Sequence, residues 1–123
     1  MRDSAANDLI NKIIKDVEKN GFNHESLIEN FKELRPFALK EEDPLATKVL
    51  RLAYQYLEEN EEFDLVIEEE EYIDEDGEVI QPETPESTDE ENVVNFVSLL
   101  LNNSNEYNRE DLRAYRDMFY ESH

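Results

Sequence analysis

The sequence predicts an all-α protein, a single domain over residues 1–123 built as a bundle of five helices. Between the third and fourth helices we expect a long acidic loop or small β-hairpin, at about 61–88. Apolar residues recur at helical spacing in five stretches, and helix-start signals precede most of them. A chain of 123 residues suits one domain with a real core.

Two amphipathic helices are predicted in the N-terminal third. The first spans about residues 4–20 and ends at Gly21, and its apolar stripe consists of Leu9, Ile10, Ile13, Ile14 and Val17. Asn23 caps the second, whose stripe consists of Leu27, Ile28, Phe31 and Leu34. We expect Pro36 to end or kink this helix, because proline lacks the amide hydrogen that a helix needs.

The third and fourth helices are predicted to be central in the bundle. Asp43-Pro44 starts the third, about 44–60, as a capping carboxylate followed by proline at the first helical position. A capping box of Thr88 and Glu91 starts the fourth, about 89–102. Both helices are apolar on more than one side, which is typical of helices surrounded by others.

A last helix is predicted after the polar turn at 102–105. Asn108 is the expected cap, and the buried face consists of Leu112, Tyr115 and Phe119. The same helix carries three arginines at helical spacing, Arg109, Arg113 and Arg116. We expect these arginines to dock onto the acidic insertion rather than to bind a phosphate, because nearby acids would compete for them.

Most of the net charge lies in residues 61–91. The whole chain has 33 acids and 12 bases, a net charge of −21, and residues 61–91 hold 16 of the acids and no base. This balance excludes a basic face that binds nucleic acid directly or lies on an anionic membrane. No apolar run approaches the length of a membrane span, and the start of the sequence lacks the pattern of a secretory signal. We therefore expect a cytoplasmic protein.

The local structure of the acidic stretch is ambiguous from the sequence. Phe63 and the apolar run 65–67 suit either a short strand or an extension of the third helix. Asp76-Gly77 is a hairpin signal, flanked by the apolar pairs Tyr72-Ile73 and Val79-Ile80. Pairing Ile73 with Ile80 would bring two glutamates face to face, and their repulsion disfavours the hairpin.

The residue types of most active sites are scarce. The chain has no cysteine, two glycines and two histidines, His24 and His123. It therefore lacks thiolate chemistry and a glycine-rich phosphate loop. His24 lies in a first helical turn, where the helix dipole disfavours its charged form, and carboxylates are too numerous for any pair to stand out. We expect no catalytic residue, no cofactor and no enzymatic activity.

A calcium site is the alternative function that the sequence offers. The stretch around Gly77 partly resembles the loop of an EF-hand, with Asp74 and Asp76 at ligand positions three and five and Glu83 at position twelve. The resemblance covers about twelve residues. It departs from the pattern at Tyr72, which stands where the first carboxylate is required, and the closing glutamate follows a proline.

Our preferred interpretation is that the acidic stretch binds a basic protein. A base-free stretch attracts a positively charged partner and speeds association. The acids and the aromatic residue expected to bind are Glu68, Glu69, Glu70, Glu71, Tyr72, Asp74 and Asp76. Apolar anchors are expected from Phe63, Leu65, Ile67, Tyr72, Ile73, Val79 and Ile80.

Two kinds of basic partner suit such a stretch. One is a nucleic-acid-binding protein, which would accept carboxylates in place of phosphates. The other is a basic toxin or nuclease, which this chain would neutralise. Small acidic immunity proteins act in this way, and this chain is similar to them in size and charge only. A solvated acidic insertion without a partner also fits the sequence. The sequence indicates neither the identity of the partner nor the oligomeric state.

Overall fold

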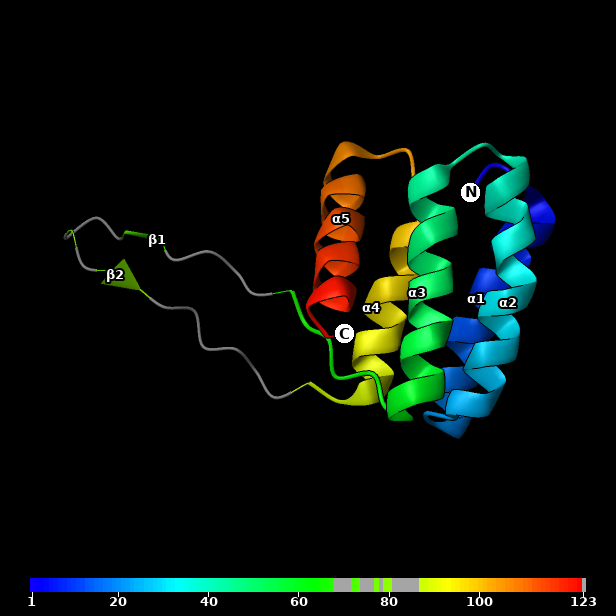
Figure 1. Ribbon diagram of the computed structural model, residues 1–123, viewed down its shortest axis with the longest axis horizontal. Coiled ribbons are helices and arrows are strands. Elements are labelled where there is room, and N and C mark those ends of the chain that lie inside the picture. Colours follow the sequence, from blue (N-terminus) through cyan, green and yellow to red (C-terminus); the bar gives the residue numbers. More distant parts are fainter. Residues whose placement is uncertain (68–71, 74–76, 78, 81–86, 123) are drawn as a thin grey trace.

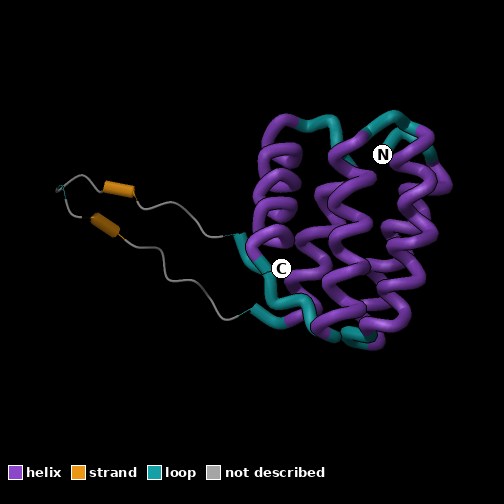
Figure 2. The backbone as a smooth tube through the Cα atoms, viewed as in Figure 1, coloured by secondary structure: helices purple, strands orange, loops and turns teal. Residues whose placement is uncertain are grey.

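The fold is described from a computed structural model of the chain. The described residues are 1–67, 72–73, 77, 79–80 and 87–122. They form five α-helices and two short strands (Figures 1 and 2): α1 (Ser4–Asn20), α2 (His24–Lys40), α3 (Pro44–Asn60), β1 (Tyr72–Ile73), β2 (Val79–Ile80), α4 (Asp89–Leu101) and α5 (Glu106–Glu121). The all-α prediction is confirmed, and α1 and α3 have the predicted bounds.

Helix α3 lies between two neighbours. It packs against α2 on one side and α5 on the other, while α4 packs against α1 and α5 (Figure 1). Its buried residues accordingly fall on two rows: Ala46, Thr47, Val49, Leu50, Leu52, Ala53, Tyr56 and Leu57. The central position predicted for this helix follows from burial on both sides.

Aromatic rings fill the core between α2, α3, α4 and α5. The ring of Phe96 lies 5.8 Å from that of Phe31 and 5.0 Å from that of Tyr115, both nearly edge-on. Phe119 joins them at 6.1 Å from Phe96 and 5.8 Å from Tyr56. Edge-to-face contacts of this kind stabilise a core beyond the area that they bury.

Side-chain caps fix where the helices begin. The Asp43 carboxylate accepts a hydrogen bond from the Ala46 amide, and the Thr88 hydroxyl accepts one from Glu91, as predicted. The last helix differs from the prediction, because Asn105 and not Asn108 is its cap. The Asn105 side chain accepts from the amides of Tyr107 and Asn108, so α5 begins three residues earlier than a cap at Asn108 would allow.

Pro36 does not end α2, which continues to Lys40. Leu34 and Ala38, two positions before and after it, are fully buried. Burial of this face against α3 therefore outweighs the hydrogen bond that proline removes from the helix.

The two strands pair antiparallel, with Tyr72 opposite Ile80 and Ile73 opposite Val79. The pairing of Ile73 with Ile80, which the sequence disfavours, differs from this register by one residue. Gly77 lies in the connection with φ +81°, a left-handed conformation that glycine adopts without steric cost.

Candidate interaction site

Residues 61–91, the acidic segment, join the helical body at two described ends, 61–67 and 87–91. At the first end Phe63 is fully buried in the aromatic core. Its ring lies 5.6 Å from Phe96, 6.2 Å from Phe119 and 6.3 Å from Tyr56. The chain is therefore anchored in the core three residues after α3 ends.

Asn92 ties this first end to the start of α4. Its side-chain amide donates a buried hydrogen bond of 2.9 Å to the carbonyl oxygen of Phe63, across 29 positions of the sequence. Asn92 is itself buried, so each group would lack a partner if the other were removed. The two ends of the acidic segment are thus joined directly to each other.

Tyr56 holds the residue that follows Phe63. Its hydroxyl donates a hydrogen bond to the Asp64 carboxylate. Burial, reinforced by this hydrogen bond and by the negative charge of Asp64, raises the pKa of Tyr56 well above its usual range. The phenol therefore stays protonated and remains a donor to Asp64 throughout the neutral range.

Glu90 fastens the second end to the turn between α1 and α2. One of its carboxylate oxygens accepts a hydrogen bond of 3.2 Å from the Phe22 amide. Hydrogen bonds from its own backbone amide and from that of Phe22 lower the pKa of Glu90. The same oxygen would lie 3.7 Å from a Cβ at Gly21, whose φ of +85° suits glycine.

The other acids at these ends remain available to an external cation. Glu62 and Glu91 are exposed, and among the described residues neither forms an ion pair with lysine, arginine or histidine. Glu61 lies 3.8 Å from the His24 imidazole, a pair that carries opposite charges only when His24 is protonated. The negative charge at both ends is therefore largely uncompensated by the described part of the protein.

Most of the residues expected to bind a partner lie outside the described residues: Glu68, Glu69, Glu70, Glu71, Asp74 and Asp76. Tyr72 lies in β1. Of the calcium ligands proposed from the sequence, Asp74, Asp76 and Glu83 are likewise outside the described part. Within that part, no group of three or more histidine or acidic residues is placed to hold a metal ion.

The expected role of Phe63 as an exposed anchor is wrong. Its ring is part of the core, and Leu65 and Ile67 are half-buried against that core. Helical spacing from Tyr56 could not have indicated this burial, because Phe63 lies three residues beyond the end of α3. Asn92 gave no signal either, because a polar residue near a helix start usually faces water.

Arg109 pairs with a residue outside the acidic segment, contrary to the prediction, and no described residue of that segment binds it. Its guanidinium pairs with Asp43 at 3.0 Å and donates to the carbonyl oxygen of Asn103 at 3.0 Å. Arg116 pairs with its neighbour Asp117 at 3.1 Å. The arginines of α5 that form described ion pairs therefore use acids from outside residues 61–91.

Comparison with protein-family models, with curated proteins and with solved structures finds no significant match to this chain. Among the described residues, no helix combines the length and the apolar character needed to cross a membrane.

Proposed function

We propose that this is a non-enzymatic, cytoplasmic interaction protein whose acidic segment binds a basic surface on a partner protein. One observation carries the proposal. Both ends of a segment with 16 acids and no base are fastened to the helical body, while exposed acids at those ends have no cationic partner among the described residues.

Anchoring matters because it fixes where the negative charge is presented. Phe63 and Asn92 hold the two ends of the acidic segment together, so the segment and its negative charge are attached to the helical body at one place. A localised negative potential steers a basic partner toward that place and raises the association rate at low salt. A nucleic-acid-binding protein and a basic toxin or nuclease are the two partner types that fit this charge.

The test compares two variants with the same change in net charge. In the first, Glu68, Glu69, Glu70 and Glu71 are replaced by glutamine. In the matched control, four exposed acids of α1 and α2 are replaced by glutamine: Glu18, Glu25, Glu29 and Glu33. Wild-type protein and both variants are immobilised, and basic proteins are captured from an extract of the source cells.

We expect wild type and the control variant to retain the same basic protein, and the Glu68–Glu71 variant to lose it. Retention should weaken as salt rises, because the interaction is screened. Equal retention by all three proteins contradicts the proposal, as does equal loss from both variants. Retention of no basic protein by wild type favours a solvated insertion without a partner.

The calcium alternative is separated by a different pair of substitutions. Asp74→Asn with Asp76→Asn removes two of the three proposed ligands but only two of 16 acids in the segment. Saturable calcium binding by wild type that this double variant abolishes would favour the alternative. A modest loss of partner affinity, without any calcium effect, would favour the interaction protein.

A further inference from the structure

A groove between α2 and α3 lies beside the turn at 41–43, far from the start of the acidic segment. Its volume is about 340 Å³. Arg35 and Leu39 of α2 and Lys48 and Arg51 of α3 line it, together with Glu42 and Asp43 of the turn. It is therefore a basic site in a chain whose net charge is −21.

The two arginines of this groove have no described partner. Neither Arg35 nor Arg51 forms an ion pair or a hydrogen bond with any described residue, although the chain has 33 acids. The Nε atom of each is buried without an acceptor, and both side chains are half-buried. Each guanidinium is thus held against the helices, which lowers the entropy lost when its outer nitrogens bind a carboxylate.

Exposed apolar side chains accompany these cations. Leu39 is 63% exposed, and Lys48 lies over the ring of Tyr120, 5.2 Å from its centre. Tyr120 is itself 45% exposed, so two of the three most exposed large apolar residues in the described part lie at or next to the groove. An apolar side chain of a ligand would bury this surface.

The local charge of the groove is positive in spite of its two acids. Asp43 already forms an ion pair with Arg109 and caps the start of α3. Glu42 alone then opposes Arg35, Lys48 and Arg51. Along α3, Arg51 is the lining residue nearest to the acidic segment, which begins ten residues later. At 1.5 Å per residue this is about 15 Å, beyond the screening length of about 8 Å at physiological salt.

We propose that this groove binds an acidic peptide segment of another protein, one that places a large apolar side chain among its carboxylates. The two arginines would bind the carboxylates, and Leu39 and Tyr120 would contact the apolar side chain. The proposal concerns a surface other than the acidic segment, so it stands or fails independently of the proposed function.

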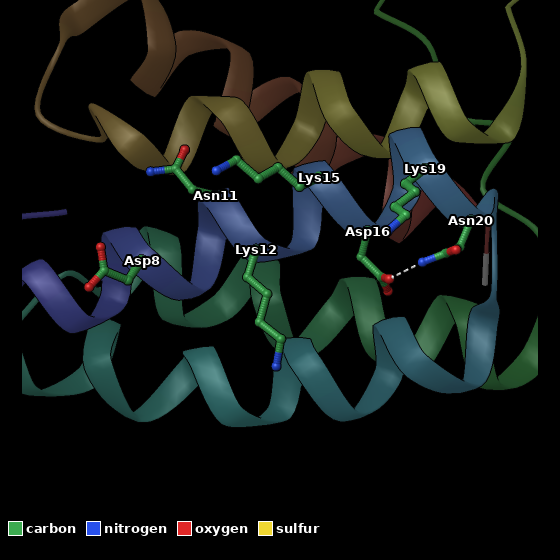
Figure 3. Close-up of a pocket in the computed structure, with 7 residues that line it drawn as sticks. All are labelled: Asp8, Asn11, Lys12, Lys15, Asp16, Lys19 and Asn20. Atoms are coloured by element: carbon green, nitrogen blue, oxygen red, sulfur yellow. Dashed lines mark hydrogen bonds between the residues drawn. The ribbon is translucent and has the colours of Figure 1, made fainter.

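The larger hollow along α1 does not offer the same chemistry. It has a volume of about 850 Å³ and is lined by residues of α1 alone, Lys12, Lys15 and Lys19 among them (Figure 3). Figure 3 shows Lys12 and Lys15 pointing away from each other, with Asp8 and Asp16 on the same helix. No large apolar side chain lines this hollow. Its lysines therefore serve as the matched control.

The experiment measures binding of a fluorescein-labelled octapeptide, EDLEEFDE, by fluorescence anisotropy. Its control peptide, QNLQQFNQ, keeps the apolar residues and lacks the carboxylates. The test variant is Arg35→Gln with Arg51→Gln, and the control variant is Lys12→Gln with Lys15→Gln, which changes the net charge equally. Lys48→Gln, at an exposed position, is a second test variant that leaves the half-buried arginines in place.

We expect the acidic peptide to bind wild type and the α1 control with affinities within about twofold of each other. The double arginine variant should bind at least about tenfold more weakly, and Lys48→Gln about threefold more weakly. The control peptide QNLQQFNQ should not bind. Equal weakening by both double variants, equal binding of both peptides, or no binding to wild type would overturn the proposal.

Discussion

Asp43 and Arg109 form an ion pair between the turn before α3 and the first turn of α5, with Oδ2 and Nη1 3.0 Å apart. The same carboxylate accepts a hydrogen bond of 3.1 Å from the Ala46 amide and one of 2.6 Å from the Asn103 side chain. Its side chain is 10% exposed. One residue therefore starts α3 and also positions the turn that leads into α5.

Substitutions at Asp43 separate these two roles. Asp43→Asn keeps a capping side chain but loses the charge, and should lower the free energy of unfolding by about 1 kcal/mol. Asp43→Ala also loses the cap, and should lower it by about 2 to 3 kcal/mol. Urea unfolding followed by circular dichroism measures both. Equal losses would mean that the cap contributes nothing beyond the ion pair.

Acid should weaken this contact in a defined range of pH. Burial would raise the pKa of Asp43, but hydrogen bonds from Arg109 and the Ala46 amide outweigh it and hold the pKa below its usual range. A lowered folded-state pKa gives stability that is present above the unfolded pKa and lost as pH falls through the folded one. The difference in stability between wild type and Asp43→Asn should therefore be constant near neutrality and shrink below about pH 4.

The difference between the two proteins is the quantity to measure, because the acidic segment also responds to acid. Protonation of its carboxylates relieves repulsion and opposes the loss at Asp43. Urea unfolding of both proteins at each pH cancels that shared effect. A difference that stayed unchanged at the most acidic pH would argue against the ion pair.

Phe63 should be the most sensitive residue of the acidic segment. Phe63→Ala removes a fully buried ring from between Phe96, Phe119 and Tyr56, and should cost about 3 to 5 kcal/mol of unfolding free energy. Leu65→Ala, at a half-buried position, should cost about 1 kcal/mol. Chemical denaturation of both variants makes the comparison. Similar small costs would show that the ring is not part of the core in solution.

Asn92 offers a test of the contact that closes the acidic segment. Asn92→Ala leaves the buried carbonyl of Phe63 without its donor, and should cost about 1 to 3 kcal/mol. Asn95→Ala, at an exposed position on the same helix, should change stability by less than about 0.5 kcal/mol. Thermal unfolding followed by circular dichroism distinguishes the two variants. Equal melting temperatures for the two variants would mean that the Asn92 side chain does not hold Phe63 in place.

The sequence predicted well those features that depend on neighbouring residues. Asp43-Pro44 and Thr88 mark helix starts, since a cap acts within one turn of its own position. Contacts made across the chain left weaker signals. Arg109 lies 66 positions from Asp43, and Asn92 lies 29 positions from Phe63. Spacing along a single helix gives no information about such partners.

The same distinction between local and long-range features applies to the candidate site. Residues 61–91 were identified from charge alone, because a run of acids without bases is visible in any sequence. The burial of Phe63 was missed, since an apolar residue among acids resembles a partner-binding anchor until the core that receives it is known. The basic groove was missed for the same reason, because Arg35 and Arg51 come together only when α2 packs on α3.

Replacement of Pro36 should increase the free energy of unfolding, whereas the substitutions described above should lower it. Proline within a helix removes one backbone hydrogen bond, and α2 continues past it because Leu34 and Ala38 are buried. Pro36 itself is exposed, so Pro36→Ala restores the missing amide without disturbing the core. We expect an increase of about 1 to 3 kcal/mol in unfolding free energy, reduced by the greater freedom of the unfolded chain. Urea unfolding measures it, with Ser98→Ala as an exposed helical control that should change little. A loss of stability would mean that the proline ring makes a contact on which α2 depends.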